Sequence, residues 1–144
     1  MPTRHHVLAH PAPPPTYVPL QPDEVSGIDF RHACALYDAG DLAGAADAFG
    51  RLCLTYPDRP EAFKALGYML YLQGQYENAS APLLFASLLD AEDPTPLYFA
   101  ALSKHRSDDL AAARDIATEA RDVALTSRHH AQISTAAQQL IDSL

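Results

Sequence analysis

Imidazole and carboxylate side chains are the groups in this sequence that could transfer protons, and they occur as scattered clusters. They are His32, His105, His129-His130, Glu92-Asp93 and Asp108-Asp109. A catalytic acid and base must both reach one substrate through hydrogen bonds, and no spacing here indicates that these groups meet. The sequence also contains no Ser-centred elbow, no HExxH pattern and no CxxC pattern. We therefore expect that the protein is not an enzyme.

Cofactor and nucleic-acid binding are disfavoured as well. His5, His6 and His10 have no neighbouring Cys or carboxylate with which to complete a metal site. No glycine-rich loop is followed by Lys and Ser or Thr, so the sequence contains no phosphate-binding loop for a nucleotide. The formal net charge is −8, and the ten Lys and Arg residues are scattered, whereas a nucleic-acid backbone requires clustered cations. We expect no metal, no cofactor and no nucleic-acid partner.

The composition indicates a small protein of the cytoplasm. No apolar run approaches the roughly 20 residues that cross a bilayer, so membrane insertion is not expected. The N-terminus has no charged-then-apolar leader pattern. Cys34 and Cys53 make no disulfide framework, and we expect two buried, reduced thiols on helices.

An internal repeat organises the chain. Three columns of residues recur with a spacing of 34: Gly40, Gly74 and Asp108; then Leu42, Tyr76 and Leu110; then Ala45, Ala79 and Ala113. A period of this length is typical of a pair of antiparallel helices that buries its apolar face against the next pair. The sequence therefore predicts an all-α fold, an α-solenoid of three tandem helix pairs.

Helix breakers set the expected boundaries. Gly40 and Gly74 are expected at turns, because glycine enters left-handed backbone conformations freely. Asp58 and Asp93 are expected to cap helices that carry Pro60 and Pro94 in their first turn. The six helices are predicted at residues 26–39, 42–56, 60–73, 76–90, 94–106 and 110–126.

Three further features depart from the simple repeat. Residues 128–144 carry one apolar stripe, which predicts a terminal helix that caps the stack. Pro82 falls inside the helix at 76–90, so we expect a kink near Asn78 or a later helix start. Residues 1–24 hold seven of the twelve prolines and are expected to form a flexible arm, ahead of a repeat domain at 25–144.

The repeat columns match the tetratricopeptide pattern. A small residue stands in each first helix (Ala33, Gly67, Ala101), and bulky residues follow in the second helices of two copies (Phe49, Leu83). The stretch from Phe49 to Ala120, with Phe63-Lys64-Ala65-Leu66-Gly67 and Tyr98-Phe99-Ala100-Ala101, further resembles the type III secretion chaperones that guard translocator proteins. That family consists of small, acidic bacterial proteins with three tetratricopeptide repeats.

The resemblance implies a mechanism and partners. The family holds an extended segment of a hydrophobic, pore-forming translocator in a concave groove and keeps it soluble in the bacterial cytoplasm until secretion; a homodimer is also expected. In a tetratricopeptide stack the first helices line that groove. The residues expected to line it are Phe30, Cys34 and Tyr37 in the first repeat, Glu61, Lys64, Tyr68 and Tyr71 in the second, and Tyr98, Leu102 and His105 in the third.

Two alternatives stay open at this point. A generic tetratricopeptide adaptor would prefer a folded domain or a C-terminal carboxylate. The sequence disfavours carboxylate capture, because only Lys64 of the ten expected groove residues is cationic. A chaperone of the secretion needle subunit would grip an amphipathic helix instead of an extended peptide.

Overall fold

The computed structural model describes residues 27–144, which form seven α-helices and one short 3₁₀ helix with no strand. The helices are α2 (Gly27–Asp38), α3 (Leu42–Thr55), α4 (Pro60–Leu72), α5 (Tyr76–Leu89), α6 (Thr95–Arg106), α7 (Leu110–Ala124), η1 (Arg128–His130) and α8 (Ala131–Ser143). Each lies within a few residues of its predicted range, so the all-α prediction is confirmed. The proposed arm at 1–24 lies outside the described residues.

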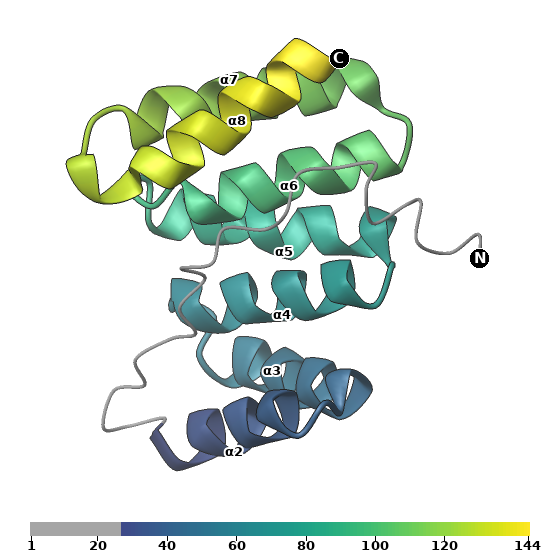
Figure 1. Ribbon diagram of the computed structural model, residues 1–144. Helices are drawn as coiled ribbons and strands as arrows, with labels where there is room; N and C mark the ends of the chain where they lie inside the picture. The colour runs from purple at the N-terminus through teal and green to yellow at the C-terminus, as the bar shows by residue number, and fades with distance from the viewer. Residues whose placement is uncertain (1–26) are drawn as a thin grey trace.

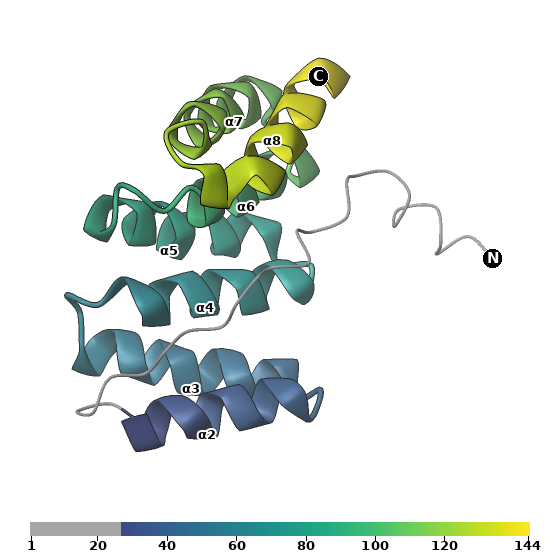
Figure 2. The ribbon, with the colours of Figure 1, turned by 60° about the vertical axis from the view of Figure 1, so that its left-hand side comes forward.

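The helices stack as three antiparallel pairs. Each helix packs on the next one in sequence, from α2 on α3 through to α7 on α8, and α4 also contacts α6 across the pairs. Figures 1 and 2 show the pairs piled along one direction, with α8 crossing α7 at the C-terminal end. The terminal helix buries Ile133, Ala137 and Leu140, so the predicted cap is confirmed. Among residues 27–144, no helix combines the length and the apolar character that crossing a bilayer requires.

The turns within the pairs share one backbone conformation. Gly40 has φ 84°, Gly74 has φ 79°, and Asp108 at the equivalent third position has φ 64°. Glycine takes this left-handed conformation without strain, and Asp is among the few other residues that tolerate it. The residue after the turn then caps the second helix in two pairs: Asp41 accepts from the Gly44 N–H at 2.9 Å and Asp109 from the Ala112 N–H at 3.2 Å.

Neither expected Asp occupies the capping position of its helix: Arg59 precedes α4, and Pro94, expected in the first turn, precedes α6. Asp93 accepts a hydrogen bond from the Thr95 N–H at 3.0 Å, close to the start of α6. Asp58 does not cap α4, because Arg59 occupies the capping position and no side chain bonds the free N–H groups there. Pro60 in the first turn removes one of those donors, which lessens the need for a cap.

Two other expectations are corrected by the structure. Helix α5 begins at Tyr76 and contains Pro82, so the expectation of a later start is wrong; a kink near Asn78 stays a prediction. Asn78 is exposed to solvent, and water can satisfy the carbonyl that Pro82 leaves without a donor. Cys53 is a buried free thiol, as expected, whereas Cys34 is only half-buried.

Close approach of the paired helices depends on small residues. Ala33 and Ala101 are fully buried on the first helices, and Ala45, Ala79 and Ala113 are fully buried on the second. Gly67 marks the tightest contact: a Cβ there would overlap the Leu83 side chain and lie 3.2 Å from the Ala79 carbonyl oxygen. The α4–α5 pair therefore requires the missing side chain at Gly67.

We predict opposite effects from the same substitution at two helical glycines. Gly67→Ala should destabilise the fold by about 1–3 kcal/mol, because the overlap with Leu83 outweighs the better helix propensity of Ala. Gly50→Ala, where nothing lies within 4 Å of the new Cβ, should stabilise by about 0.5–1 kcal/mol. Urea unfolding followed by circular dichroism measures both; a stabilised Gly67→Ala variant would contradict the assignment of this contact.

Candidate functional site

The structure places the expected groove residues on one set of helices. Phe30, Cys34 and Tyr37 lie on α2, Glu61, Lys64, Tyr68 and Tyr71 on α4, and Tyr98, Leu102 and His105 on α6. We call the surface formed by these columns the first-helix face. Its members divide into two groups by exposure: Phe30, Tyr68, Tyr71, Tyr98 and Leu102 are buried, whereas Cys34, Tyr37, Glu61, Lys64 and His105 are half-buried. Their role in binding a ligand stays a prediction.

An aromatic ladder connects the three first helices. Tyr37 of α2 meets Tyr68 of α4 edge to face, with ring centroids 6.4 Å apart. Phe99 of α6 then contacts Tyr68 at 4.9 Å and both Tyr71 and Tyr98 at 5.5 Å. Edge-to-face pairs at these distances are favourable beyond the area that they bury. The prediction from the repeat columns did not include Phe99, because Phe99 is next to the column residue Tyr98 in the sequence. In the structure Phe99 contacts Tyr68, Tyr71 and Tyr98.

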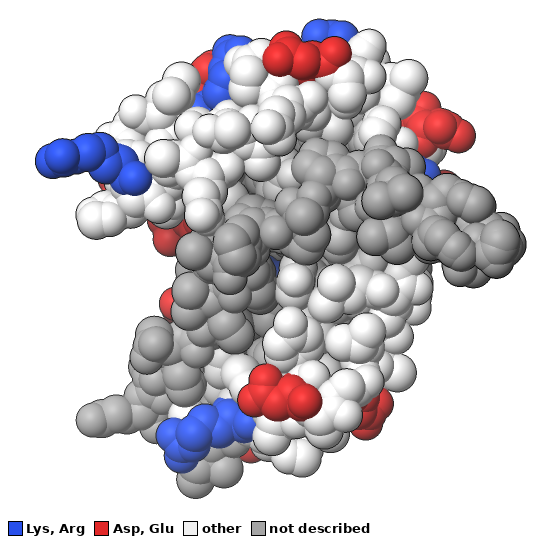
Figure 3. Space-filling model, viewed as in Figure 1, with Lys and Arg blue, Asp and Glu red and all other residues white. Residues whose placement is uncertain are grey.

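Burial keeps the ladder uncharged. It raises the pKa of Tyr68 to about 12 and that of Tyr71 to about 12, and it raises the pKa of Tyr98 further. The three hydroxyls are therefore neutral hydrogen-bond donors at any physiological pH. Figure 3 has the same viewpoint as Figure 1. On this side the part of the surface formed by residues 27–144 carries few charged side chains, and Lys, Arg, Asp and Glu lie mostly towards its ends and edges.

Several buried polar atoms beside the ladder have no hydrogen-bond partner among the described residues. The hydroxyl of Tyr98 and the Nδ1 atom of His105 are two of them, and both residues belong to the expected columns. Gln73 Oε1 and Arg106 Nη1 are two others; the Arg106 guanidinium lies 4.9 Å from the centre of the Tyr76 ring. Because an unpaired buried polar atom is costly, these groups are suited to bond the amides and carbonyls of a bound chain.

Two of the expected residues have partners within the fold. Phe30 packs edge to face on Phe49 of α3, with centroids 5.5 Å apart, and so stabilises the first helix pair. Lys64 forms an ion pair with Asp93, with 2.7 Å between Nζ and Oδ2, and each side chain is 19% exposed. The Lys64 cation is therefore already paired with a carboxylate of its own chain.

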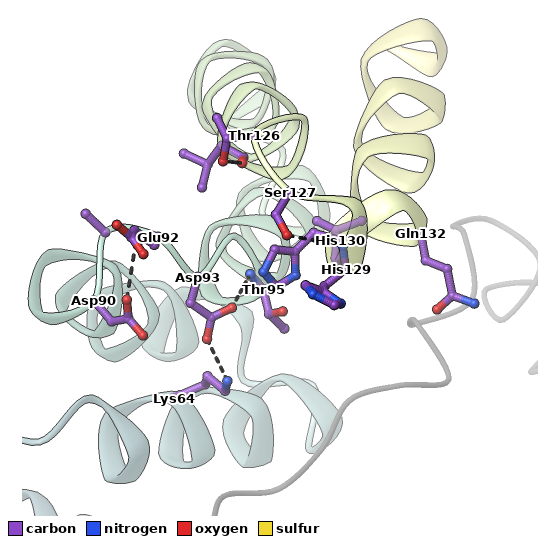
Figure 4. Close-up of a pocket in the computed structure, with 13 residues that line it drawn as sticks. Lys64, Asp90, Glu92, Asp93, Thr95, Thr126, Ser127, His129, His130 and Gln132 are labelled. Atoms are coloured by element: carbon purple, nitrogen blue, oxygen red, sulfur yellow. Dashed lines mark hydrogen bonds and ion pairs between the residues drawn. The ribbon is translucent and has the colours of Figure 1, made fainter.

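A hollow of about 990 Å³ adjoins this ion pair (Figure 4). Lys64 and Thr95 line it on the side of α4 and α6, Asp90 to Asp93 line it from the α5–α6 loop, and residues of α7, η1 and α8 close it on the other side. His129 and His130 come from η1, between α7 and α8, and Gln132 comes from the first turn of α8. The sequence did not predict this hollow, because it forms where two loops distant in the chain meet.

Comparison with solved structures identifies the fold. The chain superposes on PcrH in complex with the chaperone-binding region of PopD, with a TM-score of 0.80, 22% identity, and coverage of 85% of this chain and 92% of that chain. It superposes on the Yersinia enterocolitica chaperone SycD bound to a peptide of the translocator YopD, with a TM-score of 0.79, 20% identity, and coverage of 85% and 93%. The fold is that of the type III secretion translocator chaperones.

Further comparisons agree with this fold. PcrH from Pseudomonas aeruginosa gives a TM-score of 0.76 at 22% identity, and the match covers 89% of this chain and 97% of that chain. No protein-family model and no curated protein matches the sequence. The resemblance inferred from the repeat columns is thus confirmed for the fold, at identities that carry no residue-level detail.

The Lys64–Asp93 pair gives the fold an acid-sensitive element. Burial raises the pKa of Asp93, but the Lys64 ammonium and the hydrogen bonds from Thr95 outweigh it and hold this pKa below its ordinary value. A carboxyl with a lowered folded-state pKa stabilises the fold above its unfolded pKa of about 3.9, and the contribution is lost as the pH falls through the folded pKa.

We predict that Asp93→Asn lowers the free energy of unfolding by about 1–2 kcal/mol at pH 7. The difference from the unsubstituted protein should shrink below about pH 4, where the carboxyl of the unfolded chain becomes protonated, and vanish as the pH falls through the lower folded-state pKa of Asp93. Asp47→Asn is the matched control, because Asp47 pairs with Arg51 at 3.1 Å while their side chains are 78% and 67% exposed. Its effect should stay below about 0.5 kcal/mol. Urea titrations from pH 2 to pH 7 measure both variants, and equal effects at pH 7 would refute the assignment.

Proposed function

We propose that this protein is a cytoplasmic chaperone of bacterial type III secretion. It binds an extended segment of a hydrophobic translocator on the first-helix face and keeps that translocator soluble before secretion. The observation that supports this most directly is the aromatic ladder joining α2, α4 and α6 on a fold shared with chaperones solved in complex with regions of PopD, PopB and YopD.

The chemistry of the first-helix face suits an extended apolar ligand. Rigid rings offer large contact area at a low cost in conformational entropy, and full burial of a large apolar side chain contributes about 1.5–3 kcal/mol before ordering costs. The neutral tyrosine hydroxyls and the unpaired Tyr98 and His105 atoms supply hydrogen bonds for peptide groups. Such a chaperone acts by masking apolar surface, so it requires neither catalysis nor a nucleotide.

The adaptor alternative is less well supported. Capture of a C-terminal carboxylate requires free cations on the binding face. Lys64 is the one Lys or Arg among the expected face residues, and Asp93 already neutralises it. No particular observation favours a chaperone of the needle subunit. In that alternative the bound subunit would place an amphipathic helix on this face.

Self-association accompanies the proposal. The SycD protein of Yersinia enterocolitica has been solved as an alternative dimer, on a fold that matches this chain with a TM-score of 0.77 and 20% identity. We propose a homodimer for this chain on the same grounds.

We predict that the double variant Tyr37→Ala with His105→Ala loses its clients. Both side chains are half-buried members of one repeat column, so the fold should persist while ligand contacts are lost. The measurement is a pull-down from the bacterium of origin, read by mass spectrometry, with at least a tenfold drop expected in the recovery of hydrophobic secreted proteins.

Leu54→Ala is the matched control for this pull-down, because Leu54 is 84% exposed on α3, away from the first-helix face. It should recover the same proteins as the unsubstituted chain. Recovery of folded cytoplasmic proteins by all three baits would overturn the chaperone and favour the adaptor.

A further inference from the structure

The outer surface of α5 carries an apolar stripe. Ala81, Phe85 and Leu88 stand at positions i, i+4 and i+7 of this helix, so they share one of its faces. All three are exposed, Phe85 at 40% and Leu88 at 78%. Phe85 is held in place by an edge-to-face contact with Phe63 of α4, with ring centroids 4.6 Å apart. We call Ala81, Phe85 and Leu88 the α5 stripe; no charged residue interrupts it, because residues 78–89 contain none.

The same repeat columns are mostly charged on the other second helices. The equivalent positions lie 34 residues before and after the α5 stripe, and all of them are exposed. In order they are Asp47, Arg51 and Leu54 on α3, and Asp115, Glu119 and Asp122 on α7. Charge at these columns is what a solvated helix surface requires. The repeat fold therefore does not need apolar residues there, and their exposure on α5, in the middle pair of the stack (Figure 1), marks an interaction surface.

Acidic residues stand at both ends of the α5 stripe. Glu77 lies in the first turn of α5, and Asp90 and Glu92 follow the end of the helix at Leu89. These three carboxylates are exposed, and none forms an ion pair with another residue of the described range 27–144. The last turn of α5 contains no basic residue, so the partial negative charge of the helix C-terminus adds to that of Asp90. A ligand that matches this surface is apolar in its middle and cationic at its ends.

A second copy of this chain does not match the surface. Two α5 helices packed across a two-fold axis bring acidic end against acidic end, whether they run parallel or antiparallel. Like charges that meet across an interface weaken it, and the net charge of −8 on each chain adds repulsion at longer range. We therefore expect the homodimer to use another surface.

We propose that the α5 stripe binds an apolar α-helix that carries Lys or Arg at both ends. Phe85 and Leu88 pack against the apolar middle of that helix, and Ala81 leaves room for one of its larger side chains. Glu77 at one end and Asp90 with Glu92 at the other attract its terminal cations. Membrane-spanning helices have this chemistry, because their ends reach the headgroup region with Lys and Arg. That the helix belongs to the translocator held on the first-helix face rests on the proposed function; the binding itself does not.

A fluorescent helical peptide with a Leu and Ala core and Lys-Lys at each end is the probe that tests this proposal. The unsubstituted chain should bind it about tenfold more tightly than a peptide with the same core and Glu-Glu ends, as measured by fluorescence anisotropy. Phe85→Ser with Leu88→Ser should weaken binding of the Lys-ended probe by about tenfold or more. Leu125→Ser is the matched control: Leu125 is 66% exposed at the end of α7, and its loss should leave binding unchanged.

Two further variants keep the test independent of folding and of the first-helix face. Glu77→Gln with Glu92→Gln leaves the apolar stripe intact and should weaken binding of the Lys-ended probe about threefold, with a smaller dependence on salt. Tyr37→Ala with His105→Ala alters the first-helix face alone and should bind this probe as the unsubstituted chain does. Circular dichroism checks that each variant keeps its helical content.

Four outcomes would overturn the proposal. Equal affinity for the Lys-ended and Glu-ended peptides would show that the acidic ends recognise nothing, and unchanged binding by the Phe85 and Leu88 variant would show that the stripe is not the site. Loss of binding in the Tyr37 and His105 variant would assign the probe to the first-helix face. Sedimentation that shows the unsubstituted chain as a dimer and the Phe85 and Leu88 variant as a monomer would assign the stripe to a second copy. Because the probe is not a translocator, a failed pull-down of clients leaves this test unaffected.

Discussion

The distance between paired helices is the constraint on which the rest of the structure depends. At Gly67 the absence of a side chain lets Leu83 rest directly on the backbone of α4, and fully buried alanines hold the equivalent positions Ala33 and Ala101. The close packing of interiors means that one added carbon at such a site must displace a neighbour. The pairs therefore share one spacing, and the first helices of all three pairs present the same columns to the same side.

The chemical character of the first-helix face follows from that alignment. Because the first helices are aligned, rings 31 residues apart on α2, α4 and α6 come within edge-to-face distance, although these helices are separated in sequence by complete second helices. Burial then keeps the tyrosines neutral, and Asp93 neutralises the one lysine of the columns. The result is an apolar surface with scattered hydrogen-bonding atoms, which suits an extended chain better than a charged terminus.

Features governed by local rules could be predicted from the sequence, and features created by distant contacts could not. Gly40 and Gly74 indicated the turns, because a left-handed backbone conformation is a local requirement that glycine meets. The 34-residue period predicted an equivalent turn at Asp108, which also has a positive φ. The cap expected at Asp58 failed because a capping residue requires one particular backbone position, and Arg59 occupies it. The pairing of Lys64 with Asp93, the sharing of Phe99 by three rings and the hollow beside η1 all arise where separate segments meet.

The order of the stack also has a consequence for its mechanics. Stability in a repeat protein is a sum of contacts between neighbours, so a pair with a neighbour on each side is held more firmly than a terminal pair. Helix α8 covers the C-terminal pair, whereas within the described residues α2 packs mainly on α3 and meets α4 through the Tyr37–Tyr68 contact. We therefore expect local opening to begin at α2, which would separate Tyr37 from Tyr68. On the proposed function, the strength with which this face would retain a ligand is in that way coupled to the fraying of a single helix.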